Sequence, residues 1–258
     1  MLIDPTKRFS NRVENYVKYR PGYPDEVITF LANECNLSEG SVIADIGSGT
    51  GIFTVLLLNR GYKVYAVEPN EAMQEAAVYQ LSSNKNFIPV NGSAEITGLT
   101  EKSIDLIICA QAYHWFNNKK THAEFKRILT DEGQAALIWN NRLADADDFS
   151  KAYENILKQD TREYSEVNHR NISETDLRAL FKNGEYKAVH YPNVQVFDEA
   201  GLMGRAFSSS YVPPEGSEEG ELFRTLLKDI FNRYNTEGSV KFYYQTEVYL
   251  GKVRDSIK

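Results

Sequence analysis

Short apolar runs alternate with amphipathic stretches along the first half of the chain. Runs rich in Val, Ile, Leu and Ala that stop at glycine or polar positions predict buried strands. These runs occupy residues 42–46, 63–68, 87–90, 103–110 and 134–139. Between several of them, apolar residues recur at helical spacing, as in residues 24–35. Alternating strands and helices predict an α/β fold, in which helices cover both faces of a parallel sheet.

Helical patterns continue in the second half of the chain, where the expected strands become longer. We expect helices around residues 149–157, 176–181, 203–211 and 222–234, and strands at 187–197 and 240–253. The sequence has no internal repeat, heptad pattern or low-complexity tract. A chain of 258 residues is long enough for one α/β domain with an added cap.

The strand expected at residues 42–46 stops at a glycine-rich loop, and a helical pattern follows it. Glycine occupies positions 47, 49 and 51 of this loop. Strand, glycine turn and helix form the half-unit that binds nucleotides at the carboxyl edge of a parallel sheet. Because these positions lack side chains, the backbone can turn sharply and a ligand can lie against it.

The spacing and charge of this loop distinguish two kinds of nucleotide. A dinucleotide site favours the pattern G-x-G-x-x-G, but Ile52 stands where its third glycine would fall. Asp45 lies just before Gly47, where a carboxylate repels a pyrophosphate and attracts an ammonium or a sulfonium. The loop therefore suits S-adenosylmethionine, which carries both cations. A nucleotide-dependent oxidoreductase remains the alternative.

Three motifs indicate a family. The run D-I-G-S-G-T-G at residues 45–51 resembles the first motif of class I S-adenosylmethionine-dependent methyltransferases. The patterns Y-x-x-x-R-P-x-Y-P at 16–24 and A-x-A-x-H-W-F at 110–116 are similar to the small-molecule branch that includes trans-aconitate methyltransferase. The resemblance extends to about Asn141. It implies one domain over residues 1–258, built on a doubly wound, seven-stranded, Rossmann-like sheet whose last strand is antiparallel.

Segments outside this sheet are expected to cover its carboxyl edge. The resemblance implies that residues 1–23 form an N-terminal lid. The fold needs only one helix and two strands after its fifth strand, so residues 143–170 and 199–236 are surplus. We expect these helical insertions to form a cap and to build the acceptor pocket. The candidate substrate-binding residues are Tyr16, Tyr19, Arg142, Tyr153, Arg205, Ser209 and Tyr211.

The cofactor site is expected where several strands end. Glu68 closes the second strand, and an acid at this place accepts hydrogen bonds from ribose hydroxyls, although a solvated acid would give the same pattern. The resemblance places Met73 near the adenine ring and residues 93–95 at its edge. The expected cofactor-binding residues are Arg20, Asp45, Gly47, Ser48, Gly49, Gly51, Glu68, Pro69, Met73, Ser93, Ala94, Glu95, Ala110, Gln111 and Trp115.

A run of bulky residues follows the fourth strand, where the crevice of the sheet opens. Trp115 or Tyr113 could face a sulfonium there and gain about 0.5–2 kcal/mol. The reference pKa of His114, about 6.5, allows it to act as a base. The alternative for His114 is a hydrogen bond to the backbone without a catalytic role. We predict His114 and Tyr113 as the catalytic residues.

Composition and charge exclude other classes of protein. The net charge of −7 and the absence of a D/N-P-P-Y/F loop after the fourth strand argue against a nucleic-acid partner. The cysteines, Cys35 and Cys109, are expected to be reduced, and the histidines have no metal-ligand spacing. No apolar run approaches the roughly 20 residues of a membrane helix. We expect a cytoplasmic monomer or homodimer without metal or membrane partner.

The expected reaction is transfer of the methyl group of S-adenosylmethionine to a small-molecule acceptor, and we predict O-methylation. A carboxylate acceptor needs no base, whereas a phenol or an amine needs one. The alternative is a protein that binds S-adenosylmethionine without transferase activity, such as a sensor or a partner subunit. No motif in the expected cap identifies the acceptor.

Overall fold

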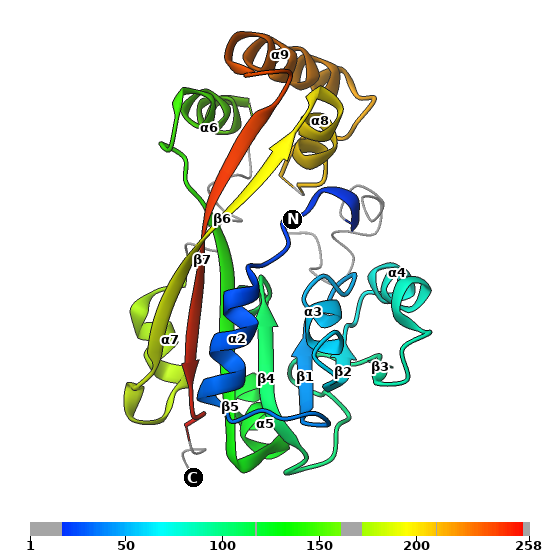
Figure 1. Cartoon of the computed structure of the whole chain (residues 1–258), viewed down its shortest axis with the longest axis vertical. Coiled ribbons are helices and arrows are strands. Elements are labelled where there is room, and N and C mark those ends of the chain that lie inside the picture. The colour runs from blue at the N-terminus through cyan, green and yellow to red at the C-terminus, as the bar shows by residue number, and fades with distance from the viewer. Residues whose placement is uncertain (1–16, 117, 161–171, 210, 255–258) are drawn as a thin grey trace.

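A seven-stranded sheet organises the computed structural model, which describes residues 17–116, 118–160, 172–209 and 211–254 (Figure 1). The strand order is β3-β2-β1-β4-β5-β7-β6. The strands are β1 (Val42–Ile46), β2 (Lys63–Val67), β3 (Phe87–Val90), β4 (Ile104–Ala110), β5 (Leu129–Arg142), β6 (Lys187–Phe197) and β7 (Val240–Gly251). β1 to β5 pair in parallel, and β7 is antiparallel to both of its neighbours. The predicted doubly wound sheet with an antiparallel last strand is confirmed.

Helices cover both faces of the sheet because the central strands are apolar on both sides. In β4, Ile107 and Cys109 face one core cluster, whereas Leu106 and Ile108 face the other. The first cluster includes residues of α5 (Lys119–Ile128) and α7 (Glu174–Leu180). The second includes residues of α2 (Asp25–Glu34), α3 (Thr54–Leu58) and α4 (Glu71–Leu81).

A third apolar cluster forms a cap at the far ends of β6 and β7 (Figure 1). It joins α6 (Asp148–Asp160), α8 (Glu199–Phe207) and α9 (Glu218–Tyr234) to the start of β7. We name these three helices the cap. α8 begins earlier than the predicted 203–211 because the Asp198 side chain accepts a hydrogen bond from Gly201 N at 2.7 Å and caps the helix.

β5 is longer than predicted. It begins at Leu129 and ends at Arg142, so Asn140 and Asn141 belong to the strand and not to a loop after it. The reason is non-local, because the end of β5 pairs with β7 as far as Arg142 opposite Tyr244. Strand pairing of this kind satisfies the backbone groups of polar residues that otherwise suggest a loop.

The segment of residues 17–23 runs between the cap and the sheet. The carbonyl of Tyr19 accepts a hydrogen bond from Gln195 Nε2 at 3.1 Å, and that of Gly22 accepts one from Asn140 Nδ2 at 3.0 Å. Most of the N-terminal lid expected in residues 1–23, including Tyr16, lies outside the described residues. In the described part of the chain, no helix has both the length and the apolar character required to cross a membrane.

Candidate functional site

A cavity of about 260 Å³ opens at the carboxyl edge of the sheet. Loops after β1, β2, β3 and β4 supply its walls, as expected for a ligand site in an open parallel sheet. We call it the main cavity. It is lined by Gly47, Gly49, Glu68, Pro69, Asn70, Met73, Ser93, Ala94, Glu95, Ala110, Gln111, Ala112, Trp115 and Phe116.

A smaller cavity of about 40 Å³ shares the glycine loop with the main cavity. Gly47, Gly49, Ala110 and Gln111 line both. The remaining lining residues of the smaller cavity are Tyr23, Asp45, Ser48, Thr50, Ile52 and Phe53. Most of the residues predicted to bind the cofactor therefore surround two adjoining spaces.

The three loop glycines have different surroundings. Gly47 and Gly49 adopt positive φ angles of 70° and 56°, which disfavour other residues. A Cβ at Gly47 would lie 2.7 Å from Ala112 Cβ, whereas one at Gly49 would meet no atom within 4 Å and would enter open space. A Cβ at Gly51 would lie 2.7 Å from Leu81 Cδ1 of α4. Gly51 thus allows helix packing and is not among the lining residues of either cavity, so its role in cofactor binding stays a prediction.

Asp45 is a buried acid at the end of β1. Its Oδ2 accepts a hydrogen bond from the Thr54 hydroxyl at 2.6 Å, whereas its buried Oδ1 has no hydrogen-bond partner among the described residues. Burial raises the pKa of Asp45 to about 7, and the nearby charge of Glu68 adds to this rise. The hydrogen bond from Thr54 lowers the pKa but does not cancel the effect of burial. A cationic ligand group would favour the ionised form of this carboxyl.

Glu68 connects the glycine loop to the start of α4. Its Oε2 accepts a hydrogen bond from Gly49 N at 2.9 Å, and its Oε1 accepts one from Asn70 N at 2.8 Å. Burial raises the pKa of Glu68, and these two hydrogen bonds oppose the rise. Asn70 caps α4 by accepting a hydrogen bond from Met73 N at 3.0 Å. Sequence reasoning missed Asn70, although an Asn before a helix is a recognisable cap signal.

The chain turns sharply at the carboxyl end of β4. Gln111 adopts a left-handed conformation with a φ of 57°, which is unusual for a residue other than glycine and is typical of functional sites. Its N–H donates to Ile138 O at 2.8 Å and its side-chain amide donates to Asn140 O at 3.3 Å. A 3₁₀ turn, Tyr113–Trp115, follows directly and decides which of the bulky side chains reach the cavity.

Neither of the two predicted catalytic residues is among the residues that line the two cavities. Tyr113 is fully buried in the core, with its hydroxyl 2.7 Å from His122 Nε2, so this geometry does not support a contact between Tyr113 and a ligand. His114 Nδ1 accepts a hydrogen bond from Trp139 Nε1 at 3.4 Å, and its ring lies 4.7 Å from that of Trp115. Of the four bulky residues at positions 113–116, Trp115 and Phe116 line the main cavity.

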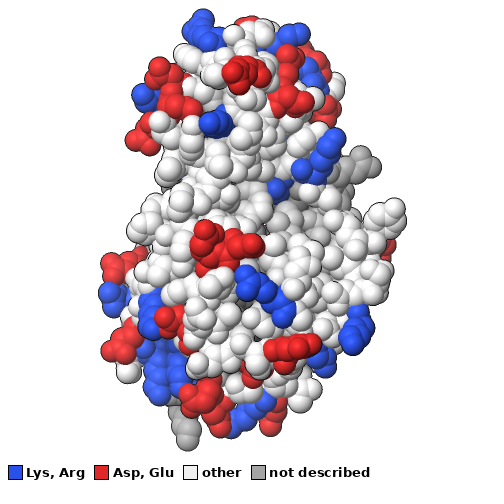
Figure 2. Space-filling model, in the orientation of Figure 1, with Lys and Arg blue, Asp and Glu red and all other residues white. Residues whose placement is uncertain are grey.

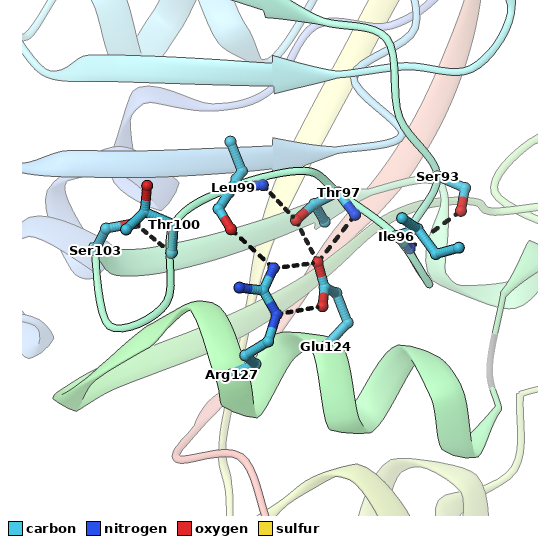
Figure 3. Close-up of polar contacts among 8 residues, drawn as sticks. All are labelled: Ser93, Ile96, Thr97, Leu99, Thr100, Ser103, Glu124 and Arg127. Carbon is cyan, nitrogen blue, oxygen red and sulfur yellow. Dashed lines mark hydrogen bonds and ion pairs between the residues drawn. The ribbon is translucent and has the colours of Figure 1, made fainter.

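Helix α5 fixes the loop that carries one wall of the main cavity (Figure 3). Glu124 accepts hydrogen bonds from Thr97 N at 2.9 Å and Thr97 Oγ1 at 2.5 Å, and from Arg127 Nε and Nη2 at 2.7 Å each. Arg127 Nη2 also donates to Leu99 O at 2.8 Å. Burial alone would raise the pKa of Glu124, but the hydrogen bonds from Arg127 and Thr97 lower it to about 2. We name these residues the Glu124 clamp.

An earlier residue of the same loop, Glu95, is also hydrogen-bonded to the N-terminal end of α5. Glu95, which lines the main cavity, accepts hydrogen bonds from Asn118 Nδ2 at 2.8 Å and from Thr121 Oγ1 at 3.4 Å. Asn118 also caps the N-terminus of α5. The wall formed by Ser93, Ala94 and Glu95 is therefore tied to α5 at Glu95, and the chain is tied to it again just afterwards at Thr97. Sequence reasoning missed the clamp because a Glu and an Arg three residues apart resemble an ordinary surface pair.

The remaining predicted substrate residues gather in and below the cap. Arg142 pairs with Glu154 at 2.5 Å and lies over the Tyr153 ring at 4.8 Å. Arg205 and Ser209 are buried and bonded to each other. Arg20, predicted to bind the cofactor, instead donates to Ser208 O at the end of α8. The structure brings these residues together with the described parts of the lid, while Tyr211 lies half-buried beside them.

Comparisons with known proteins agree with this geometry. A family model described as "Methyltransferase domain" matches residues 44–137. A Dictyostelium discoideum protein named as a methyltransferase is 31% identical over 241 residues, which cover 87% of this chain and 88% of that protein. A methyltransferase-like protein of Schizosaccharomyces pombe is 28% identical over 247 residues, with 93% of each chain covered.

A solved structure shares the fold. The type II methyltransferase from Anaeromyxobacter dehalogenans superposes with a TM-score of 0.67 over 91% of this chain and 98% of its own. The two sequences are 20% identical. At that identity the likeness concerns the architecture of the sheet and the helices around it.

Proposed function

The chain belongs to the class I S-adenosylmethionine-dependent methyltransferases, and from this premise we propose that it methylates an oxygen atom of a small-molecule acceptor. The main cavity carries this proposal, because it is bounded by the glycine loop, by Glu68 and by Trp115 at one edge of the sheet. The narrower likeness to the trans-aconitate branch stays a prediction.

The residues present fit the cofactor of this family. Asp45 offers a buried carboxylate oxygen that has no hydrogen-bond partner in the described part of the chain, beside a loop that leaves open space at Gly49. A carboxylate in this position suits the ammonium and the sulfonium of S-adenosylmethionine. Glu68 would accept hydrogen bonds from the ribose hydroxyls, and Met73 with Ser93 would hold the adenine. When bound, the cofactor supplies a methyl group on sulfur, and the departing thioether needs no proton donor.

The described lining favours an acceptor that is already nucleophilic. Among the described residues that line the two cavities there is no His or Lys to remove a proton. A carboxylate oxygen would need no base, and this supports O-methylation. The contribution of the protein would then be alignment of the two reactants and exclusion of water. For a phenol, His114 remains the candidate base, since it adjoins Trp115.

The surface supports a small acceptor. Figure 2 shows acidic and basic side chains interspersed on the visible face, without a continuous basic surface of the kind that nucleic acids require. The cap stands beyond the sheet on the extended strands β6 and β7, where it can enclose an acceptor (Figure 1).

Calorimetry with S-adenosylhomocysteine, followed by turnover with radiolabelled S-adenosylmethionine and a panel of carboxylic acids, phenols and amines, tests the proposal. We expect binding of the cofactor product and label transfer to an oxygen of one class. Binding without transfer to any acceptor would favour the alternative of a binding protein without transferase activity. Absence of binding would contradict the assignment of the main cavity.

A further inference from the structure

Arg205 is a buried cation in the middle of the cap. Its side chain lies on α8 and the residue is 7% exposed. Nε donates to the Tyr244 hydroxyl at 3.3 Å, Nη1 donates to Ser209 Oγ at 3.2 Å, and the guanidinium lies 5.9 Å from the centre of the Phe242 ring. Each of these partners is neutral. Within the described residues, no carboxylate forms an ion pair with Arg205.

Glu154, an acid in the same part of the cap, already forms ion pairs with other basic side chains. Glu154 pairs with Arg142 at 2.5 Å and with Lys158 at 3.4 Å. The guanidinium of Arg142 lies 4.8 Å from the centre of the Tyr153 ring. Burial raises the pKa of Tyr153, and the charges of Arg205 and Arg142 both oppose that rise. The described part of this cluster therefore holds more positive than negative charge.

A buried guanidinium without an acid is energetically costly. Removing a charge from water carries a large penalty, which proteins normally offset with an opposite charge and further hydrogen bonds. Arginine presents its donors in a planar fork that matches a carboxylate or a phosphate. A bound anion would supply the missing charge.

The segment of residues 17–23 connects the surroundings of Arg205 with the cofactor site. A Cβ at the neighbouring Gly204 would lie 2.0 Å from Tyr19 Cε2, so the Tyr19 ring rests directly on α8. Farther along the same segment, Tyr23 lines the smaller cavity and its ring packs 4.9 Å from that of Phe53. The backbone from Tyr19 to Tyr23 spans at most roughly 14 Å. One small molecule could therefore reach from the cofactor site to the surroundings of Arg205.

We propose that Arg205 anchors an anionic group of the methyl acceptor, either a carboxylate or a phosphate, with the hydroxyl of Ser209 as a further donor. This inference rests on the proposed function, because it assigns a substrate class to the same site. Figure 2 shows basic side chains along the crease between the cap and the body of the sheet, where such an acceptor would enter.

A purely structural role for Arg205 makes a different prediction. The Tyr244 hydroxyl also donates to Gln195 Oε1 at 2.9 Å, so it keeps a partner when Arg205 is replaced. If Arg205 served only to tie α8 to β7, Arg205→Met would lower the melting temperature. If Arg205 is held for a ligand, loss of its charge should leave the melting temperature of the ligand-free protein unchanged or raise it.

The test is a titration of the protein saturated with S-adenosylhomocysteine, using glutarate, inorganic phosphate and the uncharged glutaramide as probes. We expect one of the two anions to bind, and glutaramide to bind at least about tenfold more weakly. Arg205→Met should weaken binding of that anion at least about tenfold, while Arg205→Lys should retain part of it. Arg178→Met, which removes an exposed arginine of α7, is the control and should bind like the wild type.

The outcomes distinguish a carboxylate acceptor from a phosphorylated one. They also distinguish failure of this inference from failure of the proposed function. Binding of glutarate alone indicates a carboxylate acceptor, and binding of phosphate alone a phosphorylated one. The inference is overturned if neither anion binds the wild type, if glutaramide binds equally well, or if Arg205→Met binds the anion unchanged. A lower melting temperature of ligand-free Arg205→Met also contradicts it. Failure to bind S-adenosylhomocysteine would instead count against the proposed function.

Discussion

The carboxylate of Glu68 accepts a hydrogen bond from the backbone N–H of Gly49 at 2.9 Å, across the mouth of the main cavity. The acid at the end of β2 therefore already holds the glycine loop that follows β1. Its second oxygen accepts from Asn70 N at 2.8 Å, which extends the connection to α4. A ligand that binds Glu68 thus binds to a carboxylate whose position is fixed on two sides.

Glu68→Ala should weaken binding of S-adenosylhomocysteine at least about tenfold, since hydrogen bonds to a carboxylate contribute about 1.5–3 kcal/mol each. The protein should stay folded but melt at a lower temperature, because the N–H groups of Gly49 and Asn70 lose their acceptor. Calorimetry measures the affinity, and circular dichroism checks the fold. The control is Glu71→Ala, which removes an exposed acid at the start of α4. Unchanged affinity in Glu68→Ala would refute the ribose assignment.

Gly49→Val should abolish measurable cofactor binding, because a side chain at this position projects into the open space of the cavity. It also forces a non-glycine residue to a φ of 56°, which costs about 1–2 kcal/mol. Gly238→Val separates the two effects, since Gly238 has a φ of 76° and open space in a hairpin that is not part of either cavity lining. The control should lose stability and keep affinity. Equal affinities in the two variants would place the loop outside the binding site.

Much of this architecture was predictable because buried parallel strands carry their signal locally. Runs such as 42–46 and 103–110 are apolar on both sides, so neither strand could be mistaken for a surface element. The direction of Tyr113 was not predictable, since it depends on the left-handed Gln111 and on the 3₁₀ turn that follows. The length of β5 depends on pairing with β7, which lies about a hundred residues later in the chain and leaves no local pattern.

Glu124→Ala should lower the free energy of unfolding by about 1–3 kcal/mol, since it leaves the buried Thr97 N–H without its acceptor. The loop that carries Ser93 and Glu95 should loosen, and affinity for S-adenosylhomocysteine should fall with it. Denaturant unfolding and calorimetry measure the two effects.

The matched control for the Glu124 clamp is Glu174→Ala. It breaks a similar pair with Arg178, but both side chains are exposed, at 67% and 56%. Such a surface pair contributes less than about 1 kcal/mol. If Glu124→Ala loses no more stability than this control, or keeps wild-type affinity, the clamp does not position the cavity wall.

His114→Ala should slow methyl transfer without weakening cofactor binding if His114 is a base for a protonated acceptor. Tyr113→Phe should leave the rate unchanged, because its hydroxyl faces His122 in the core. The rates of the two variants are compared over a range of pH, with each acceptor of the panel that the wild type methylates. For a carboxylate acceptor, which needs no base, we expect the rate of His114→Ala to match the wild type. A large loss of rate in Tyr113→Phe alone would contradict the placement of Tyr113.

Binding of S-adenosylmethionine should weaken as the pH falls below about 7. Burial raises the pKa of Asp45 to about 7 in the ligand-free protein, so at lower pH most molecules hold this carboxyl protonated. A cation binds the ionised form better, so binding releases the proton. A ligand whose binding releases one proton loses up to about tenfold in affinity for each pH unit well below the pKa of the group.

Calorimetry from about pH 5.5 to about pH 8, in buffers of different ionisation enthalpy, measures both the affinity and the proton released. The pKa of Glu68 is also raised by burial, so the wild-type profile alone does not identify the titrating group. Asp45→Asn identifies it, because this variant should bind more weakly at pH 8 and show a flatter profile below it. If Asp45→Asn retains the full pH dependence of the wild type, then the buried carboxyl at the end of β1 is not the group that meets the cation.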